Sequence, residues 1–98
     1  MIVVRNVFQL KFGKAKEAIA LWKEGRENLK SLGHLPDRIL TDITGTYYTF
    51  IIETSYKNLS EFEESLPAMF SDEKYRRWYE KFLPLAESGY REIFKVEE

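Results

Sequence analysis

The residue whose position most suggests chemistry is Glu53, a lone acid within the stretch YYTFIIETSY at 47–56. One alternate set of this stretch is apolar and the other, which contains Glu53, is mixed, so a half-buried strand is predicted. Arg5 has the same mixed phase in the first predicted strand, and Asp42 has it in the strand before the stretch. A carboxylate beside a guanidinium could act as a general base with a cation that steers an anionic substrate. The pair could instead be a structural ion pair in a dimer interface, which is the interpretation we favour.

The remaining side chains restrict the catalytic chemistry further. His34 is the only histidine and follows Gly33, a residue that suits the left-handed end of a helix, so we expect His34 in a solvated turn. The chain has no cysteine, and a single histidine is a weak metal signal. No Ser/His/Asp set and no glycine-rich phosphate loop is present in the sequence. We therefore expect no metal site.

The elements that must position these side chains follow from the apolar spacing. Alternation, helical spacing and turn residues predict the order strand, helix, strand, strand, helix, strand. The predicted ranges are 2–12, 14–32, 37–43, 46–56, 58–87 and 90–96, with the second helical region in two pieces. Thr44-Gly45 predicts a two-residue turn that places Ile39 opposite Phe50, with Ile43 also on the core face. The segment 90–96 shows no consistent alternation, so its facing stays open.

This order predicts an α+β fold, the ferredoxin-like βαββαβ plait, as one domain over residues 1–98. Its four-stranded antiparallel sheet has the order 4-1-3-2, with two helices on one face. Since the helices cover only that face, an apolar surplus is left on the other. The surplus residues are Val3, Val7, Leu40, Tyr47 and Ile51. We expect two copies to pack these faces together as a homodimer, with Arg5 and Glu53 in the interface.

Two segments resemble a known family. RNVFQLKFGK (5–14) resembles the first-strand pattern of NIPSNAP-like proteins, which ends in leucine, lysine, one residue, glycine and lysine. FSDEKYRRWYEKFLPLAESGYREIFKV (70–96) resembles the acidic cap, aromatic helix, proline-leucine exit and terminal strand of the same group. The group belongs to the dimeric α+β-barrel superfamily, in which two ferredoxin-like protomers pack their sheets into a barrel. The resemblance implies this fold and this dimer, with an ill-defined family role and several chemistries across the superfamily.

The resemblance also implies where a ligand would bind. In haem-degrading and cofactor-free oxygenase relatives, the pocket lies between sheet and helices, with polar and aromatic residues in similar elements. The candidates here are Asn6, Phe8, Trp78, Tyr79 and Phe82. Haem-binding relatives place a histidine ligand on the second helix, where this chain has none, so we expect no haem and no other cofactor. The alternative for Trp78 is an ordinary core aromatic, and for Asn6 a hydrogen-bonded buried amide.

Composition narrows the partners and the location. A net charge of −1 over 98 residues gives no electrostatic reason to bind nucleic acid or an anionic membrane surface. An RNA-recognition domain shares the plait and carries aromatics on its third strand, but Tyr48 and Phe50 are predicted to face inward here. No stretch reaches the ~20 apolar residues of a membrane span, and the amino terminus lacks the features of a signal peptide. The lack of cysteine suits a reducing compartment, so we expect a cytoplasmic location.

The sequence thus favours a protein that binds a small apolar or aromatic molecule between the sheet and the second helix. Oxygenase-like activity is one extension of this hypothesis. The alternative is a homodimeric assembly or regulatory module without catalysis.

Overall fold

A computed structural model describes all residues, 1–98, as a single sheet with helices on one side. The elements are β1 (Ile2–Leu10), α1 (Ala15–Ser31), β2 (Arg38–Thr41), β3 (Thr49–Tyr56), α2 (Leu59–Phe70), α3 (Glu73–Phe82), the short 3₁₀ turn η1 (Leu83–Leu85) and β4 (Ala86–Lys95). The sheet is antiparallel in the order β2-β3-β1-β4. This is the predicted strand order, so the ferredoxin-like α+β fold is confirmed.

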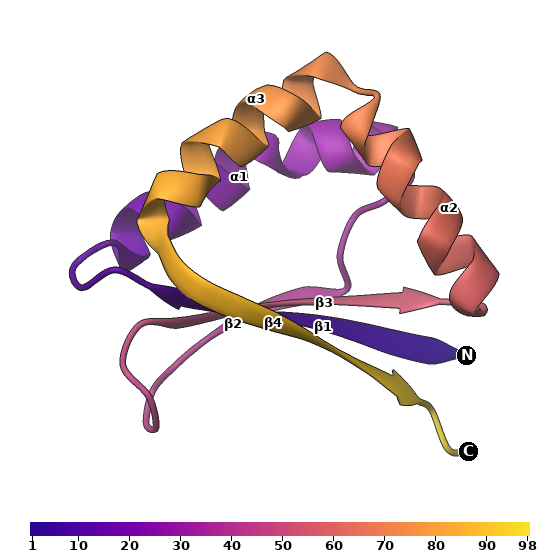
Figure 1. The fold of residues 1–98 in the computed structure, drawn as a ribbon, viewed down its shortest axis with the longest axis horizontal. Helices are drawn as coiled ribbons and strands as arrows, with labels where there is room; N and C mark the ends of the chain where they lie inside the picture. Colours follow the sequence, from indigo (N-terminus) through magenta and orange to yellow (C-terminus); the bar gives the residue numbers. More distant parts are fainter.

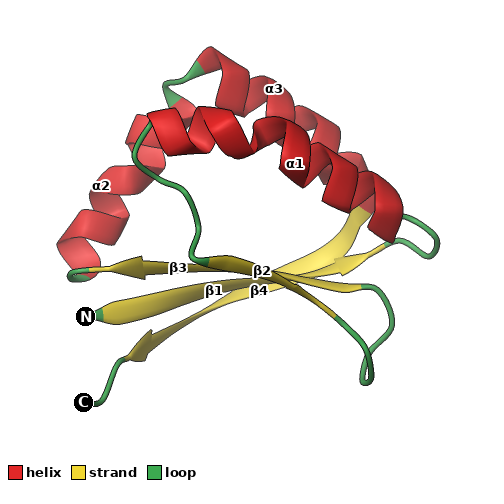
Figure 2. Ribbon diagram, turned by 180° about the vertical axis from the view of Figure 1, so that it is seen from behind, coloured by secondary structure: helices red, strands yellow, loops and turns green.

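The three helices lie on one face of the sheet and leave the other face open (Figure 1, Figure 2). The region predicted as one interrupted helix forms α2 and α3, which meet at a corner above the sheet, while α1 runs alongside (Figure 1). None of the helices has the length and apolar composition that a membrane-crossing segment requires.

The helix ends follow from capping residues. Gly33 adopts φ 77°, and the backbone N–H of His34 reaches back to the carbonyl of Leu29, as in a Schellman ending. The Asn58 side chain caps α2 by accepting from the Glu61 N–H, at 2.9 Å. The Asp72 carboxylate caps α3 at Tyr75 N and also accepts from Asn28 of α1, both at 2.9 Å. These two hydrogen bonds, led by the one from Asn28, lower the pKa of Asp72 below its usual value.

The hairpin between β2 and β3 is longer than the predicted two-residue turn. β2 ends at Thr41 and β3 begins at Thr49, and Thr41 lies opposite Phe50. Ile39 therefore pairs with Ile52 instead of Phe50. The register differs from the prediction by two residues, and an even shift leaves each side chain on its predicted face.

Local hydrogen bonds explain the longer loop. The Asp42 carboxylate accepts from the Thr49 N–H at 2.9 Å, and the Thr49 hydroxyl donates to the Thr46 carbonyl at 2.8 Å. Tyr48 completes the turn with a positive φ of 58°. Ile43, predicted to face the core, is consequently in the loop with its side chain 98 % exposed.

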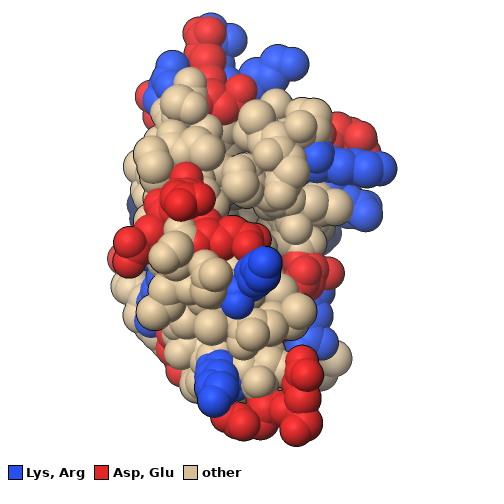
Figure 3. All heavy atoms as spheres, turned by 90° about the vertical axis from the view of Figure 1, so that its right-hand side faces the viewer, with Lys and Arg blue, Asp and Glu red and all other residues tan.

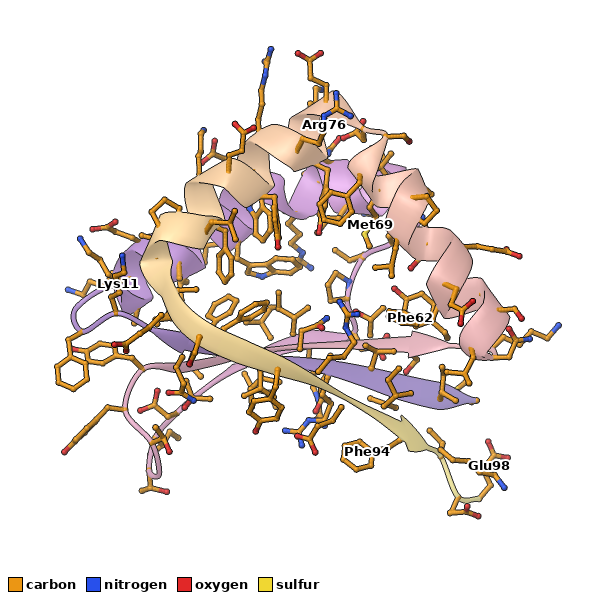
Figure 4. The ribbon with its side chains drawn as sticks, in the orientation of Figure 1. Lys11, Phe62, Met69, Arg76, Phe94 and Glu98 are labelled. Atoms are coloured by element: carbon orange, nitrogen blue, oxygen red, sulfur yellow. The ribbon has the colours of Figure 1, made fainter.

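The last strand begins earlier than predicted, and its pairing with β1 settles its facing. Asn6 lies opposite Arg91 and Val4 opposite Ile93, so these β4 residues face the helices. Tyr90 and Phe94 alternate with them and face away, as Figure 4 shows for Phe94 below the sheet. Glycine is required at position 89, inside the strand, because a Cβ there would be only 2.9 Å from the Phe8 ring.

The core lies between the sheet and the helices in two parts. The larger cluster joins Leu10, Ala18, Leu21, Phe50, Phe82 and Leu85, and the smaller joins Val4, Tyr56 and Phe62. The clusters are separate, which leaves room for a cavity.

Candidate functional site

A cavity of about 520 Å³ lies between the sheet and the helices. Its walls come from β1, β3 and β4 below and from α1, α2 and α3 above. Phe62 and Met69 of α2 point into this space in Figure 4. The side of the molecule seen in Figure 3 is hollowed near its centre, with charged side chains of both signs around the hollow.

All five side chains predicted to line a pocket border this cavity: Asn6, Phe8, Trp78, Tyr79 and Phe82. Phe82 is only 1 % exposed and belongs to the core, with its ring edge-on to Phe8 at a centroid distance of 4.9 Å. Trp78 stacks on Phe82 at 5.4 Å with an interplanar angle of 6°. Phe82 therefore supports the wall that Trp78 presents.

Trp78 is held by α1 as well as by its own helix. Its indole Nε1–H donates to the carbonyl oxygen of Leu21 at 2.7 Å. The ring lies so close to Gly25 that a Cβ there would be 2.6 Å from the Trp78 Cδ1 atom. The indole is thus fixed in position. Trp78 packs as a core aromatic and also borders the cavity, so both interpretations made from the sequence apply to it.

Tyr75, one turn before Tyr79 on α3, is a further aromatic of the wall that was not among the predicted site residues. It stacks on Trp78 at 5.9 Å. Burial, followed by the neighbouring phenol of Tyr79, raises the pKa of Tyr75 to about 12. Its hydroxyl therefore stays protonated at neutral pH and can donate a hydrogen bond.

Asn6 has a specific partner in the cavity wall. The Nε–H of Arg91 donates to Asn6 Oδ1 at 2.8 Å, and the guanidinium carbon lies 5.1 Å from the centre of the Phe62 ring. The sequence did not indicate Arg91, because the facing of the last strand was open. His34 follows the turn that ends α1, as predicted, and is partly exposed; it also borders the cavity, which the sequence did not indicate.

Glu53 lies on the opposite face of the sheet, away from the cavity. It is 7 % exposed, and its oxygens contact Nε of Arg5 at 2.8 Å and Nε of Arg38 at 2.6 Å. The expected Arg5–Glu53 pair is therefore present, and Arg38 adds a second cation. Glu92 lies opposite Arg5 on β4, so charges alternate across the four strands. Both Glu53 oxygens are engaged, which favours the structural interpretation over a general base.

The other predicted interface residues also lie on the open face or beside it. Leu40, Ile51 and Val7 form one row across β2, β3 and β1, which Tyr90 of β4 continues. Tyr47 is 73 % exposed in the hairpin loop. The Asp42 carboxylate accepts a hydrogen bond in the hairpin loop and is not part of the ion-pair group around Glu53. We refer to the row Leu40, Ile51, Val7 and Tyr90 as the apolar row.

Acidic, histidine and cysteine side chains form no group of three or more that could hold a metal ion. The side chains that border the cavity can supply aromatic contact, hydrogen bonding and one guanidinium.

No protein-family model matches the chain, and no curated protein matches it. Solved structures do. A NIPSNAP family protein from Agrobacterium tumefaciens has a TM-score of 0.91 at 18 % identity, over 99 % of this chain and 86 % of its own. The chain has the NIPSNAP fold. An uncharacterized NIPSNAP domain protein from Burkholderia xenovorans has a TM-score of 0.87 at 15 % identity, over 99 % of this chain and 95 % of its own.

A second kind of protein shares the architecture less closely. A putative antibiotic biosynthesis monooxygenase from Nitrosomonas europaea has a TM-score of 0.72 at 15 % identity, over 98 % of each chain. The predicted resemblance to NIPSNAP-like proteins is therefore confirmed at the level of the fold, and the monooxygenase is a more distant neighbour of this NIPSNAP-like chain.

Proposed function

We propose that this protein binds a small apolar or aromatic molecule in the cavity between the sheet and the helices. The observation that carries the proposal is the cavity itself, since 17 of its 25 bordering residues are hydrophobic. Its size of about 520 Å³ lies within the range of small-molecule sites, roughly 300–1,000 Å³. A few polar groups, among them Asn6 and Arg91, lie in an otherwise apolar wall, as is usual for such sites.

An oxygenase-like reaction on the bound molecule is a second candidate. It is favoured by the likeness of fold to a protein named as a putative antibiotic biosynthesis monooxygenase. The proposal includes no haem and no other cofactor. It places the protein in the cytoplasm, where a chain without cysteine is suited to the reducing conditions.

A thermal-shift screen with apolar acids, quinones, phenols and haem tests the proposal. A ligand that binds only the folded state at 100 times its Kd stabilises it by about 2.7 kcal/mol. We expect at least one of these classes to raise the Tm of the wild-type protein. In Trp78→Ala the same ligand should leave Tm unchanged relative to that variant without ligand. Phe12→Ala is the matched control, because Phe12 is 76 % exposed and does not border the cavity. No rise with any class would instead favour the non-catalytic homodimeric module.

We propose further that two copies of the chain pack their open sheet faces together. Within the apolar row Tyr90 is 59 % exposed and Leu40 and Ile51 are partly exposed, while Val7 is buried. Phe94, on the same face, is 47 % exposed. Contiguous apolar surface rimmed by charge is typical of protein interfaces. The alternating charges of Arg38, Glu53, Arg5 and Glu92 border the apolar row and would favour one register of the two sheets.

Sedimentation of Ile51→Arg tests the homodimer. We expect the wild-type chain to sediment as a dimer at micromolar concentration and Ile51→Arg as a monomer, because an arginine in the apolar row would be buried without a partner. Leu59→Arg is the control: Leu59 is 54 % exposed on α2, so its substitution should leave the mass unchanged. A monomeric wild type would contradict the proposal, as would a folded Ile51→Arg that remains dimeric.

A further inference from the structure

The cavity wall contains one cationic side chain, which suggests the chemical class of the ligand. Arg91 is the only lysine or arginine among the residues that border the cavity, and Glu87 is the only aspartate or glutamate. The two lie four residues apart on β4, which separates them by about 13 Å along an extended strand. Arg91 is an exposed residue, so it gives one part of the cavity wall a positive charge that a ligand can reach from solvent.

The guanidinium of Arg91 is held in place without being neutralised. Its Nε–H donates to the neutral Asn6 side chain at 2.8 Å, and its planar group lies over the Phe62 ring at 5.1 Å. It forms no ion pair within the chain, in contrast to Arg5, Arg38 and Arg77, each of which contacts a glutamate. The positive charge thus has no counter-charge in the protein, and the terminal nitrogens remain available to a ligand.

The sheet fixes this arrangement. Asn6 and Arg91 are directly opposite each other in the β1–β4 ladder, so both side chains leave the sheet toward the helices. Phe62 is buried and reaches the guanidinium from α2. A cation supported on two sides by rigid elements loses little freedom when it binds an anion, which raises affinity.

We propose that the cavity binds monocarboxylates with an aromatic or alkyl body, and that Arg91 binds the carboxylate group. This inference rests on the proposed function and specifies its ligand class. The guanidinium matches a carboxylate in shape and can donate two parallel hydrogen bonds to it. A single cation balances a single negative charge, while Trp78 and its aromatic neighbours accept the apolar body of the ligand.

Isothermal titration with two matched pairs of probes tests the proposal. The pairs are 1-naphthaleneacetate with 1-naphthaleneacetamide and octanoate with octanamide, which differ in charge but hardly in shape. Hydrogen bonds to charged groups predict that the acid of a pair binds about 10- to 100-fold more tightly than its amide. In Arg91→Gln we expect the acid to bind as weakly as the amide, with binding of the amide unchanged. Arg26→Gln, which removes the same charge from an exposed site on α1, should behave as the wild type.

A second variant keeps the arginine and changes its partner. Asn6→Asp places a carboxylate beside the guanidinium, and we expect it to abolish the preference for the acid while the amide still binds. Equal binding of acid and amide to the wild type would overturn the carboxylate inference and leave the cavity as a binding site. A preference that survives both Arg91→Gln and Asn6→Asp would overturn the role of Arg91. No binding of either pair at millimolar concentration would overturn the proposed function together with this inference.

Discussion

Replacing Phe82 with alanine is expected to lower the free energy of unfolding by about 3–5 kcal/mol. Phe82 is 1 % exposed at the end of α3, and its ring contacts Phe8, Phe50 and Trp78 at centroid distances of 4.9, 5.8 and 5.4 Å. Its removal would leave a void where α3 packs on the sheet. Since small domains have a total stability of about 5–15 kcal/mol, this single change removes a large fraction of it.

Equilibrium unfolding in urea measures this loss. Glu80→Ala is the control on the same helix, where an exposed side chain should change the stability by no more than about 0.5 kcal/mol. A loss below about 1 kcal/mol for Phe82→Ala would mean that the ring is not the contact that anchors α3 to the sheet.

Replacing Gly25 with alanine is expected to destabilise the protein by about 1–3 kcal/mol, through overpacking. A loss of stability would point to a steric clash, because a glycine-to-alanine change inside a helix normally stabilises the protein by about 1 kcal/mol. Here the added Cβ would stand 2.6 Å from Cδ1 and 2.7 Å from Nε1 of Trp78. The indole would have to move away from α1 and lose its hydrogen bond to the Leu21 carbonyl.

A double-mutant cycle, measured by unfolding in urea, separates the overpacking against Trp78 from the gain in helix propensity that alanine brings. In a Trp78→Ala background the obstacle is gone, so Gly25→Ala should stabilise the protein instead of destabilising it. Ala20→Gly on the exposed side of α1 gives the helix-propensity term alone, a loss of about 1 kcal/mol. A stabilising effect of Gly25→Ala in the wild-type background would show that Trp78 does not pack against Gly25.

The strand order and the two faces of β1 and β3 could be predicted because alternation was clear in both strands. Glu53 on the open face beside Arg5 follows directly from that alternation. The length of the β2–β3 hairpin could not be predicted, because it depends on the Asp42 carboxylate capping Thr49, a contact that competes with the tight turn at Thr44-Gly45. The face assignment survived because the shift in register is even.

The candidate site could be predicted only where the apolar pattern of its elements was clear. Asn6 and the aromatics of α3 have a clear phase, so their place between sheet and helices could be anticipated. Arg91 could not be assigned, since polar and apolar residues are mixed along β4 and only pairing with β1 fixes which of them face the helices. The position of His34 beside the cavity could not be predicted, because the path of a loop after a helix depends on tertiary contacts that its own residues do not encode.

Pairing of the first strand with the last also bears on how the chain acquires its structure during synthesis. β1 is made first, yet one of its edges stays unpaired until β4, in which Lys95 lies opposite Ile2, has left the ribosome. The growing chain thus carries an unpaired apolar strand edge until β4 has been made. Unpaired strand edges of this kind promote aggregation of incompletely folded chains. The cavity is closed by the same late event, because Arg91 belongs to β4. A ligand of this cavity would therefore stabilise the chain only after β4 has been made.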